Sequence, residues 1–145
     1  IWTFIYTKFK LIYNHSMKKL LLLLFSLLLS FNSYGEWVSL GDSQNKTHYL
    51  EVDTIKENNS YLYSWDMQDY FEPQGDTGML SSKMYRQIDC GVHRFKILSF
   101  ISYNQSMGKG RASDPYIPPD EWEYPSSETF PYVLIQAVCW THENM

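Results

Sequence analysis

Apolar and polar residues alternate through the middle of the chain, with the period of two that a half-buried β-strand requires. In residues 80–89, the even-numbered positions fall on one face and the odd-numbered positions on the other. A second alternating run follows Gly91 and continues as a strongly apolar stretch to about Tyr103. Glycine readily takes the positive φ of a tight turn. Residues 80–103 therefore predict two antiparallel strands that meet at Asp89-Cys90-Gly91.

Residues 36–40, 47–52 and 61–70 alternate in the same way. The first two segments predict an opening hairpin, and the third predicts a strand with Tyr61, Tyr63, Trp65 and Met67 on one face. We expect this face to contribute heavily to the core, because a large aromatic side chain buries about 150–250 Å². Residues 53–55 predict a short helical turn capped by Asp53. Proline and glycine in residues 71–79 and 104–121 predict loops.

One segment of the mature chain has a helical period. After Ser126-Ser127-Glu128-Thr129, apolar residues recur at the spacing i, i+3, i+4, i+7 and i+8, namely Phe130, Val133, Leu134, Ala137 and Val138. This spacing predicts an amphipathic helix that packs one face on the sheet. Pro131 fits only in the first turn, so the helix should begin near Thr129. The pattern predicts an α+β fold, an antiparallel sheet of about five to six strands packed against a C-terminal α-helix.

The N-terminal part has the three regions of a secretory signal peptide. A positive start, Met17-Lys18-Lys19, precedes the apolar run Leu20–Leu29, and the small residues Ser33 and Gly35 predict cleavage before Glu36. The apolar run is shorter than the roughly 20 residues of a membrane-spanning helix. We interpret residues 1–16 as translated upstream sequence, 17–35 as the signal peptide and 36–145 as one exported domain with no membrane span, located in the periplasm, on the cell surface or in the medium.

The composition is that of a globular protein, with 44% hydrophobic and 17% aromatic residues. The formal net charge of −4 includes Lys8, Lys10, Lys18 and Lys19, which lie upstream of the expected cleavage site. Without them, 8 basic and 16 acidic residues remain, a net charge of −8. Nucleic-acid binding depends on clustered Lys and Arg residues. The sequence has no such cluster, which argues against a nucleic-acid partner.

The two cysteines lie at the expected turn and at the expected helix end. In an exported chain this placement favours a Cys90–Cys139 disulfide. Each cysteine also has a histidine three residues on, His93 and His142, which leaves a thiol nucleophile or a tetrahedral zinc site as alternatives. An oxidising compartment favours the disulfide over both. No other group of residues has a catalytic or metal-ligand spacing, so we expect a protein without enzyme activity, metal or cofactor.

A series of residues runs through the mature chain in a characteristic order: Trp37, Tyr49, Asp53, Ile55, Trp65, Asp69-Tyr70, Ser81-Ser82, Asp89-Cys90, Arg94, Gly108, Trp122, Pro125-Ser126 and Cys139. This order resembles the surface-adhesin protein E family of Gram-negative bacteria over nearly all of residues 36–140. The resemblance implies an antiparallel sheet tied to a C-terminal helix by a disulfide. It also implies an outward-facing protein that binds host matrix or plasma proteins such as vitronectin and laminin, and that can form a homodimer.

We therefore expect an exported, non-enzymatic binding module. Its candidate contact residues lie in or beside the long loop, with Tyr116 and Trp122 as aromatic anchors and Lys109 and Arg111 as basic contacts. The loop at residues 71–79 is a second candidate surface. The alternative is a periplasmic structural or accessory protein with a bacterial partner, because the chain lacks the lipid-anchor cysteine of the best-known family member.

Overall fold

The computed structural model describes residues 17–20, 22–23 and 35–145. The expected upstream sequence, residues 1–16, lies outside the described residues, as does most of the expected signal peptide, of which residues 17–20 and 22–23 are helical. Residues 35–145 form one compact unit. Across the three described ranges, no helix has the length and apolar character that a membrane span requires.

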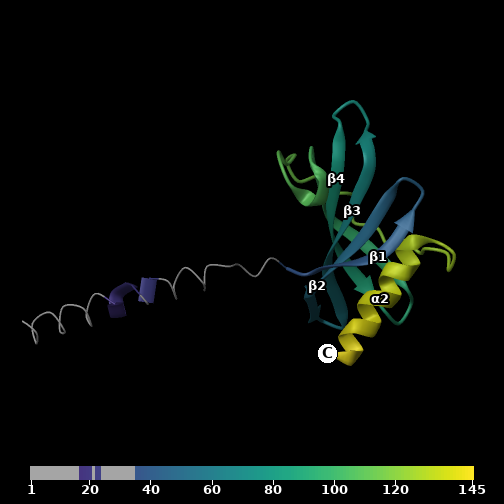
Figure 1. Ribbon diagram of the computed structural model, residues 1–145. Helices are drawn as coiled ribbons and strands as arrows, with labels where there is room; N and C mark the ends of the chain where they lie inside the picture. The colour runs from purple at the N-terminus through teal and green to yellow at the C-terminus, as the bar shows by residue number, and fades with distance from the viewer. Residues whose placement is uncertain (1–16, 21, 24–34) are drawn as a thin grey trace, which may run out of the picture. The chain divides into compact units, whose positions relative to one another are not determined.

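Five antiparallel strands form a single sheet in which sequence neighbours are also neighbours in space. The strands are β1 (Trp37–Ser43), β2 (Lys46–Asn58), β3 (Tyr61–Gln74), β4 (Met79–Asp89) and β5 (Arg94–Tyr103). A short 3-10 helix, η1 (Ser106–Gly108), follows, and the chain ends in α2 (Phe130–Asn144). The helix packs across one part of the sheet, while the β3–β4 hairpin extends beyond it (Figure 1). The expected α+β fold is confirmed, with five strands.

The β4–β5 turn forms where the sequence predicts it, but an aspartate side chain stabilises it instead of a glycine with a positive φ. The Asp89 carboxylate accepts hydrogen bonds from the N–H groups of Gly91 and Val92, at 3.1 and 3.4 Å. The positive φ falls on His93, at 54°, and not on Gly91. An aspartate side chain that binds the next backbone N–H groups can replace a glycine turn, which explains why the expected role of Gly91 was wrong.

Two expected boundaries also differ. The helical turn predicted at residues 53–55 is absent, because β2 runs through this stretch with a bulge between Glu51 and Lys56. Thr54 supports the bulge, since its hydroxyl donates to the Glu51 carbonyl at 2.7 Å and accepts from the Trp65 N–H at 3.1 Å. The predicted loop at residues 71–79 shrinks to residues 75–78, because β3 extends to Gln74.

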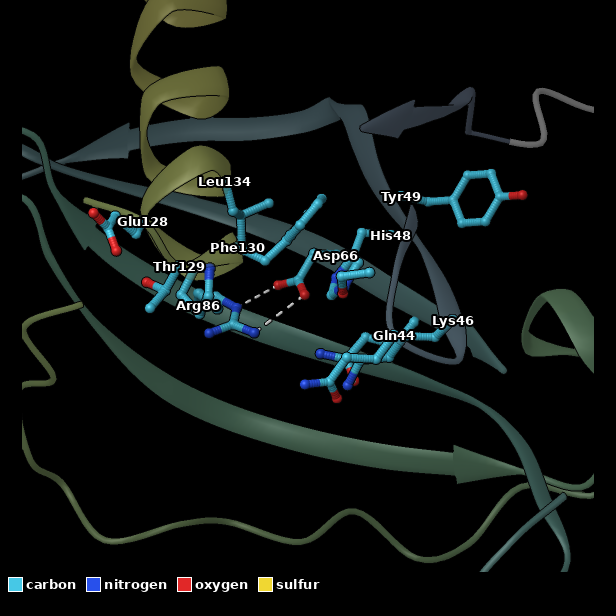
Figure 2. A pocket seen from close by; sticks show the side chains of 13 residues that line it. Gln44, Lys46, His48, Tyr49, Asp66, Arg86, Glu128, Thr129, Phe130 and Leu134 are labelled. Carbon is cyan, nitrogen blue, oxygen red and sulfur yellow. Dashed lines mark hydrogen bonds and ion pairs between the residues drawn. The ribbon is translucent and has the colours of Figure 1, made fainter. Parts of the chain in front are cut away.

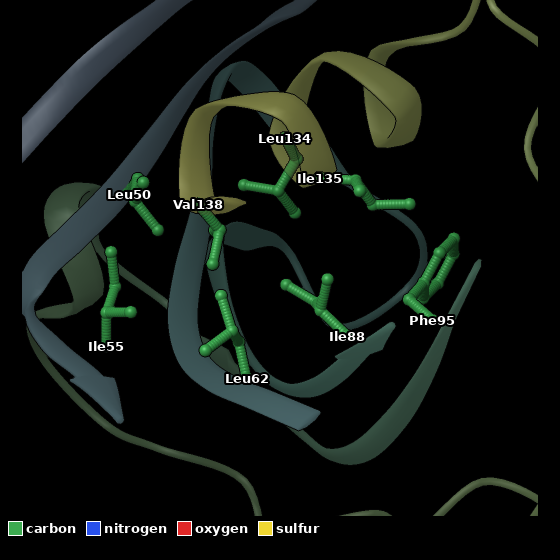
Figure 3. Close-up of a cluster of buried hydrophobic side chains, with 8 residues drawn as sticks. All are labelled: Leu50, Ile55, Leu62, Ile88, Phe95, Leu134, Ile135 and Val138. Atoms are coloured by element: carbon green, nitrogen blue, oxygen red, sulfur yellow. The ribbon is translucent and has the colours of Figure 1, made fainter. Parts of the chain in front are cut away.

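The core lies between α2 and the sheet face that it covers (Figure 3). It contains Leu50, Ile55, Leu62, Ile88, Phe95, Leu134, Ile135 and Val138. Burying an aliphatic side chain of this size stabilises the fold by about 1.5–3 kcal/mol. Leu134 and Val138 are buried as expected, whereas Val133 is 40% exposed and Ile135 takes its place. The buried stripe of α2 therefore shares Leu134 and Val138 with the predicted one and is shifted towards Ile135 by less than a quarter of a turn.

The aromatic residues of β3 do not form this core, contrary to our expectation. Tyr61, Tyr63 and Trp65 lie on the sheet face away from α2 and are partly exposed, whereas Leu62 on the opposite face is buried. Met67 lies on the aromatic face and is fully buried. Alternation identified the two faces correctly, but it gave no information about which face the helix would cover.

A disulfide joins Cys90 in the β4–β5 turn to Cys139 in α2, with the Cα atoms 6.0 Å apart. The two residues are 49 positions apart, and closing a loop of this length stabilises by about 4 kcal/mol in the chain-entropy model. The bond occupies both thiols, so neither a thiol nucleophile nor a two-cysteine zinc site can form. The neighbouring histidines have other partners, because His93 packs on Tyr132 and His142 pairs with Glu57 at 3.1 Å.

Candidate functional site

The long segment after β5 runs back along the outer side of that strand. Hydrogen bonds join Phe100 to Tyr116 in both directions, at 2.8 and 2.9 Å, and Phe95 to Glu123, at 2.8 and 3.0 Å. A further bridge pairs Tyr103 with Ala112. The segment therefore covers the β5 edge of the sheet without forming a regular sixth strand. Its backbone is fixed at several points although it was predicted as a loop.

Trp122 is one of the four predicted contact residues, and it holds this segment to the sheet. Its ring packs on Tyr61 with the centroids 5.4 Å apart. The guanidinium of Arg94 lies 4.2 Å from the ring centroid and the Lys96 ammonium 4.8 Å. Cation–π contacts of this kind are worth about 0.5–2 kcal/mol each. Much of the Trp122 surface is therefore used inside the protein.

Tyr116 is placed differently. Its side chain is 60% exposed and that of its neighbour Ile117 is 74% exposed, although the Tyr116 backbone is bonded to Phe100. Pro115 and Pro118 lie on either side and restrict the φ angle of the backbone. The result is a pair of exposed large side chains on a fixed backbone.

Some basic residues are paired with carboxylates and others are not. Three of them form ion pairs with carboxylates, namely Arg86 with Asp66, Arg94 with Asp89, and Lys96 with Asp120. Lys109 and Arg111 are exposed, and neither has an acidic partner within 4.0 Å in the described part of the chain. They lie near the end of β5, whereas Trp122 lies near its start. The four predicted contact residues are therefore spread along one edge: Lys109 and Arg111 lie near the end of β5, Tyr116 beside Phe100, and Trp122 near the start of the strand.

Arg111 also lines a pocket of about 480 Å³ beside this edge. The pocket includes Thr77 and Met79 from the β3–β4 turn region, together with Tyr103 and Asp114. Close by, the Lys83 ammonium lies between two aromatic rings, 5.2 Å from the Trp37 centroid and 5.4 Å from the Tyr103 centroid. The predicted loop at residues 71–79 thus contributes to this surface only at its end.

A second pocket, which the sequence does not predict, lies where α2 begins (Figure 2). It has a volume of about 420 Å³ and is formed by the β1–β2 turn, the sheet and the first turn of α2. Its lining residues are Ser43, Gln44, Lys46, His48, Tyr49, Asp66, Gln68, Arg86, Glu128, Thr129, Phe130, Pro131 and Leu134. Pockets of roughly 300–1,000 Å³ are typical of small-ligand sites.

The pocket contains a buried ion pair. Arg86 Nε donates to Asp66 Oδ1 at 2.5 Å and Nη2 donates to Oδ2 at 3.3 Å, and each side chain is 5% exposed. Burial raises the pKa of Asp66, and the Arg86 guanidinium opposes that rise. The alternation of β3 and β4 could have revealed this pair, since both residues occupy positions on the same face as Leu62 and Ile88.

His48 and Lys46 line the same pocket. The His48 ring stacks on Phe130 with centroids 3.5 Å apart, and its Nε2 hydrogen-bonds the Ser43 hydroxyl at 2.6 Å. Burial, with the nearby positive charges of Lys46 and Arg86, lowers the pKa of His48 to about 4, so the ring is neutral at pH 7. Lys46 Nζ donates to Gln68 Oε1 at 3.0 Å, and burial lowers the pKa of this lysine.

The Ser43–His48 contact has the form of a nucleophile and a base. A hydrolase triad needs a third group, usually a carboxylate, to orient the histidine. Among the described residues, no carboxylate bonds the His48 ring. The Ser43–His48 pair therefore has no bonded orienting carboxylate among the described residues.

The chain is thus a disulfide-tied α+β domain that presents exposed side chains on a backbone bonded to one sheet edge. A family model described as surface-adhesin protein E matches residues 37–140, and the chain belongs to that family. This confirms the resemblance inferred from the sequence.

Solved structures show the same fold. Haemophilus influenzae protein E in its crystal form II superimposes with a TM-score of 0.57 at 15% identity, covering 77% of this chain and 92% of that one. A second structure of H. influenzae protein E gives a TM-score of 0.57 at 14% identity, with 79% and 90% covered. Protein E from non-typeable H. influenzae gives 0.52 at 13% identity, with 79% and 82% covered. No curated protein matches the chain.

Proposed function

We propose that the chain is an exported, non-enzymatic adhesin module that binds a protein partner through the surface formed by Lys109, Arg111, Tyr116 and Ile117, here called the loop surface. The observation that carries the proposal is the exposure of Tyr116 on a backbone bonded to Phe100. A backbone that is already fixed loses little entropy on binding. Tyr and Arg are also enriched among residues that dominate binding energy.

The same reasoning changes the role of Trp122. Its ring contacts Tyr61, Arg94 and Lys96, so we infer that it supports the loop surface from inside and makes little direct contact with a partner. Lys109 and Arg111 have no acidic partner in the described part of the chain. Their charges favour an acidic segment on the partner.

The proposed partners are host matrix or plasma proteins such as vitronectin and laminin, in keeping with membership of a surface-adhesin family. The proposal includes removal of residues 17–35 as a signal peptide and export of residues 36–145 as one domain. β1 pairs with a single neighbouring strand, β2. An edge strand of this kind can pair with a second copy, and a homodimer is part of the proposal.

The test is the binding of oxidised protein, residues 36–145, to immobilised vitronectin and laminin at physiological salt. We expect saturable binding that is lost in a disulfide-reduced sample. A Lys109→Gln/Arg111→Gln variant should bind several-fold more weakly, and Lys56→Gln, which removes another exposed lysine, should bind normally. The proposal fails if binding is absent at micromolar concentrations, or if the two charge variants behave alike.

Location needs a separate measurement. Fractionation of cells that express the full chain should place the mature protein on the surface or in the medium. Recovery in the periplasm alone would favour the accessory-protein interpretation, and the search would turn to bacterial partners.

A further inference from the structure

The polar pocket at the start of α2 has no part in the proposed adhesive surface. We propose that this pocket is a binding site for a small organic carboxylate, which is held by Arg86, Lys46 and the first backbone N–H of α2. The proposal rests on the pocket residues alone and is independent of the loop surface.

Three hydrogen-bond donors with unused capacity line the pocket. Arg86 uses Nε and Nη2 on Asp66, but Nη1 has no hydrogen-bond partner in the described part of the chain. Lys46 Nζ donates to Gln68 and has no carboxylate partner among residues 35–145. The ammonium group has three donors, so two remain for a ligand.

The third donor comes from the helix itself. The first N–H groups of a helix lack intrahelical partners and carry a partial positive charge. Thr129 precedes α2 but its side chain does not cap the helix. Its hydroxyl donates instead to the Ser126 carbonyl at 2.7 Å. Among the described residues, no side chain or carbonyl accepts from the Phe130 N–H.

Besides the three donors, the fixed position of Arg86 supports the proposed site. Its side chain is 5% exposed. The guanidinium lies 4.6 Å from the Phe95 ring centroid and is bonded twice to Asp66. A nearly buried guanidinium that is held in this way and still lines a pocket is a pre-organised anion contact, since little entropy is lost when a ligand binds it.

The rest of the lining favours an organic carboxylate over an inorganic anion. Phe130, Pro131 and Leu134 present apolar surface beside the donors. A carboxylate with an apolar body can use both parts of the pocket, whereas phosphate can use only the charges. Two acidic residues also line the pocket. Asp66 is paired with Arg86, so Arg86 offers a ligand its Nη1 donor and Lys46 supplies the positive charge; Glu128 has no ion-pair partner among residues 35–145.

The experiment compares three probes by ¹H–¹⁵N NMR titration of oxidised residues 36–145, namely benzoate, its uncharged analogue benzamide, and inorganic phosphate. We expect saturable benzoate shifts at the amides of Lys46, His48 and Phe130, with benzamide at least tenfold weaker. Phosphate should bind more weakly than benzoate. Equal affinities for benzoate and benzamide, or tighter binding of phosphate, would overturn the assignment.

Matched variants test the individual contacts without disturbing the buried ion pair. Lys46→Met should weaken benzoate binding at least fivefold, whereas Lys109→Met, outside the pocket, should change it less than twofold. Glu128→Gln should tighten binding about twofold, because it removes a repulsive charge. If the two lysine variants bind benzoate equally well, or if the shifts occur only at the loop surface, the proposed site is wrong. Neither result would bear on adhesion.

Discussion

The buried Arg86–Asp66 ion pair allows a quantitative test of how the pocket is held together. Each side chain is 5% exposed and the pair makes two hydrogen bonds. Removing one member leaves the other charge buried without a partner, which costs about 3–5 kcal/mol. Asp66→Asn and Arg86→Met should each lower the free energy of unfolding by this amount. The loss would be a large part of a typical total of about 5–15 kcal/mol.

The double variant should be far less unstable than the sum of the two single variants. Once one charge is gone, removing the other relieves a penalty, so the double variant should be at least as stable as either single variant. The coupling energy in urea unfolding should therefore be about 3–5 kcal/mol. The more exposed Arg94–Asp89 pair, at 2.9 Å, serves as the matched control. Coupling there should be about 0.2–1 kcal/mol. The losses of unfolding free energy in the two single variants could instead add in the double variant, or couple no more than in the control pair. Either result would show that Arg86 and Asp66 are not a buried, interdependent ion pair, and the reasoning would fail.

Three further predictions concern the disulfide, the buried histidine and the tryptophan. Replacing Cys90 and Cys139 with serine should cost about 3–4 kcal/mol in urea unfolding; an unchanged midpoint would mean that the bond adds no constraint. Because the pKa of His48 is about 4 when folded and 6.5 otherwise, the unfolded state binds the proton more readily, and stability should fall as the pH drops from 6.5 towards 4. A His48→Gln variant should lose that part of the pH dependence, and an identical pH profile would refute the role of His48. Trp122→Ala should speed proteolysis of residues 104–129 and amide exchange at Glu123, while unchanged rates would show that the tryptophan does not hold the segment.

Strand pairing and the disulfide could be predicted from the sequence. Strand pairing depends on local alternation, and the disulfide depends on the number of cysteines. Alternation defines a strand and its two faces without reference to distant residues. Two cysteines in a chain that is expected to be exported leave one intramolecular pairing. These features correctly identified β4, β5 and the Cys90–Cys139 bond. The expected position of Cys139 at the helix end was wrong, because α2 continues to Asn144.

The sequence could not predict features that depend on which distant surfaces come into contact. The helix covers the Leu62 face of β3 rather than the aromatic face, and Ile135 replaces Val133 in the core. Both outcomes depend on how α2 is placed against the sheet. The polar pocket was missed for the same reason, since it joins residues of five separate elements, β1, β2, β3, β4 and α2, that only the folded chain brings together.

The candidate contact residues were also predicted only in part. Sequence composition identified the long proline-containing segment and its aromatic residues. It could not indicate that the segment would bond to the β5 edge, with Tyr116 exposed and Trp122 packed against Arg94. Two aromatic residues six positions apart therefore have different roles.

The most direct test of the adhesive surface is the affinity of Tyr116→Ala for an immobilised partner, vitronectin or laminin, measured beside wild type and Trp140→Ala. Trp140 is a matched control, because it is 67% exposed and lies on α2. Loss of a central aromatic contact is worth about 2 kcal/mol or more, so Tyr116→Ala should bind at least tenfold more weakly while Trp140→Ala binds like wild type. Equal affinities for the two variants would contradict the proposed surface.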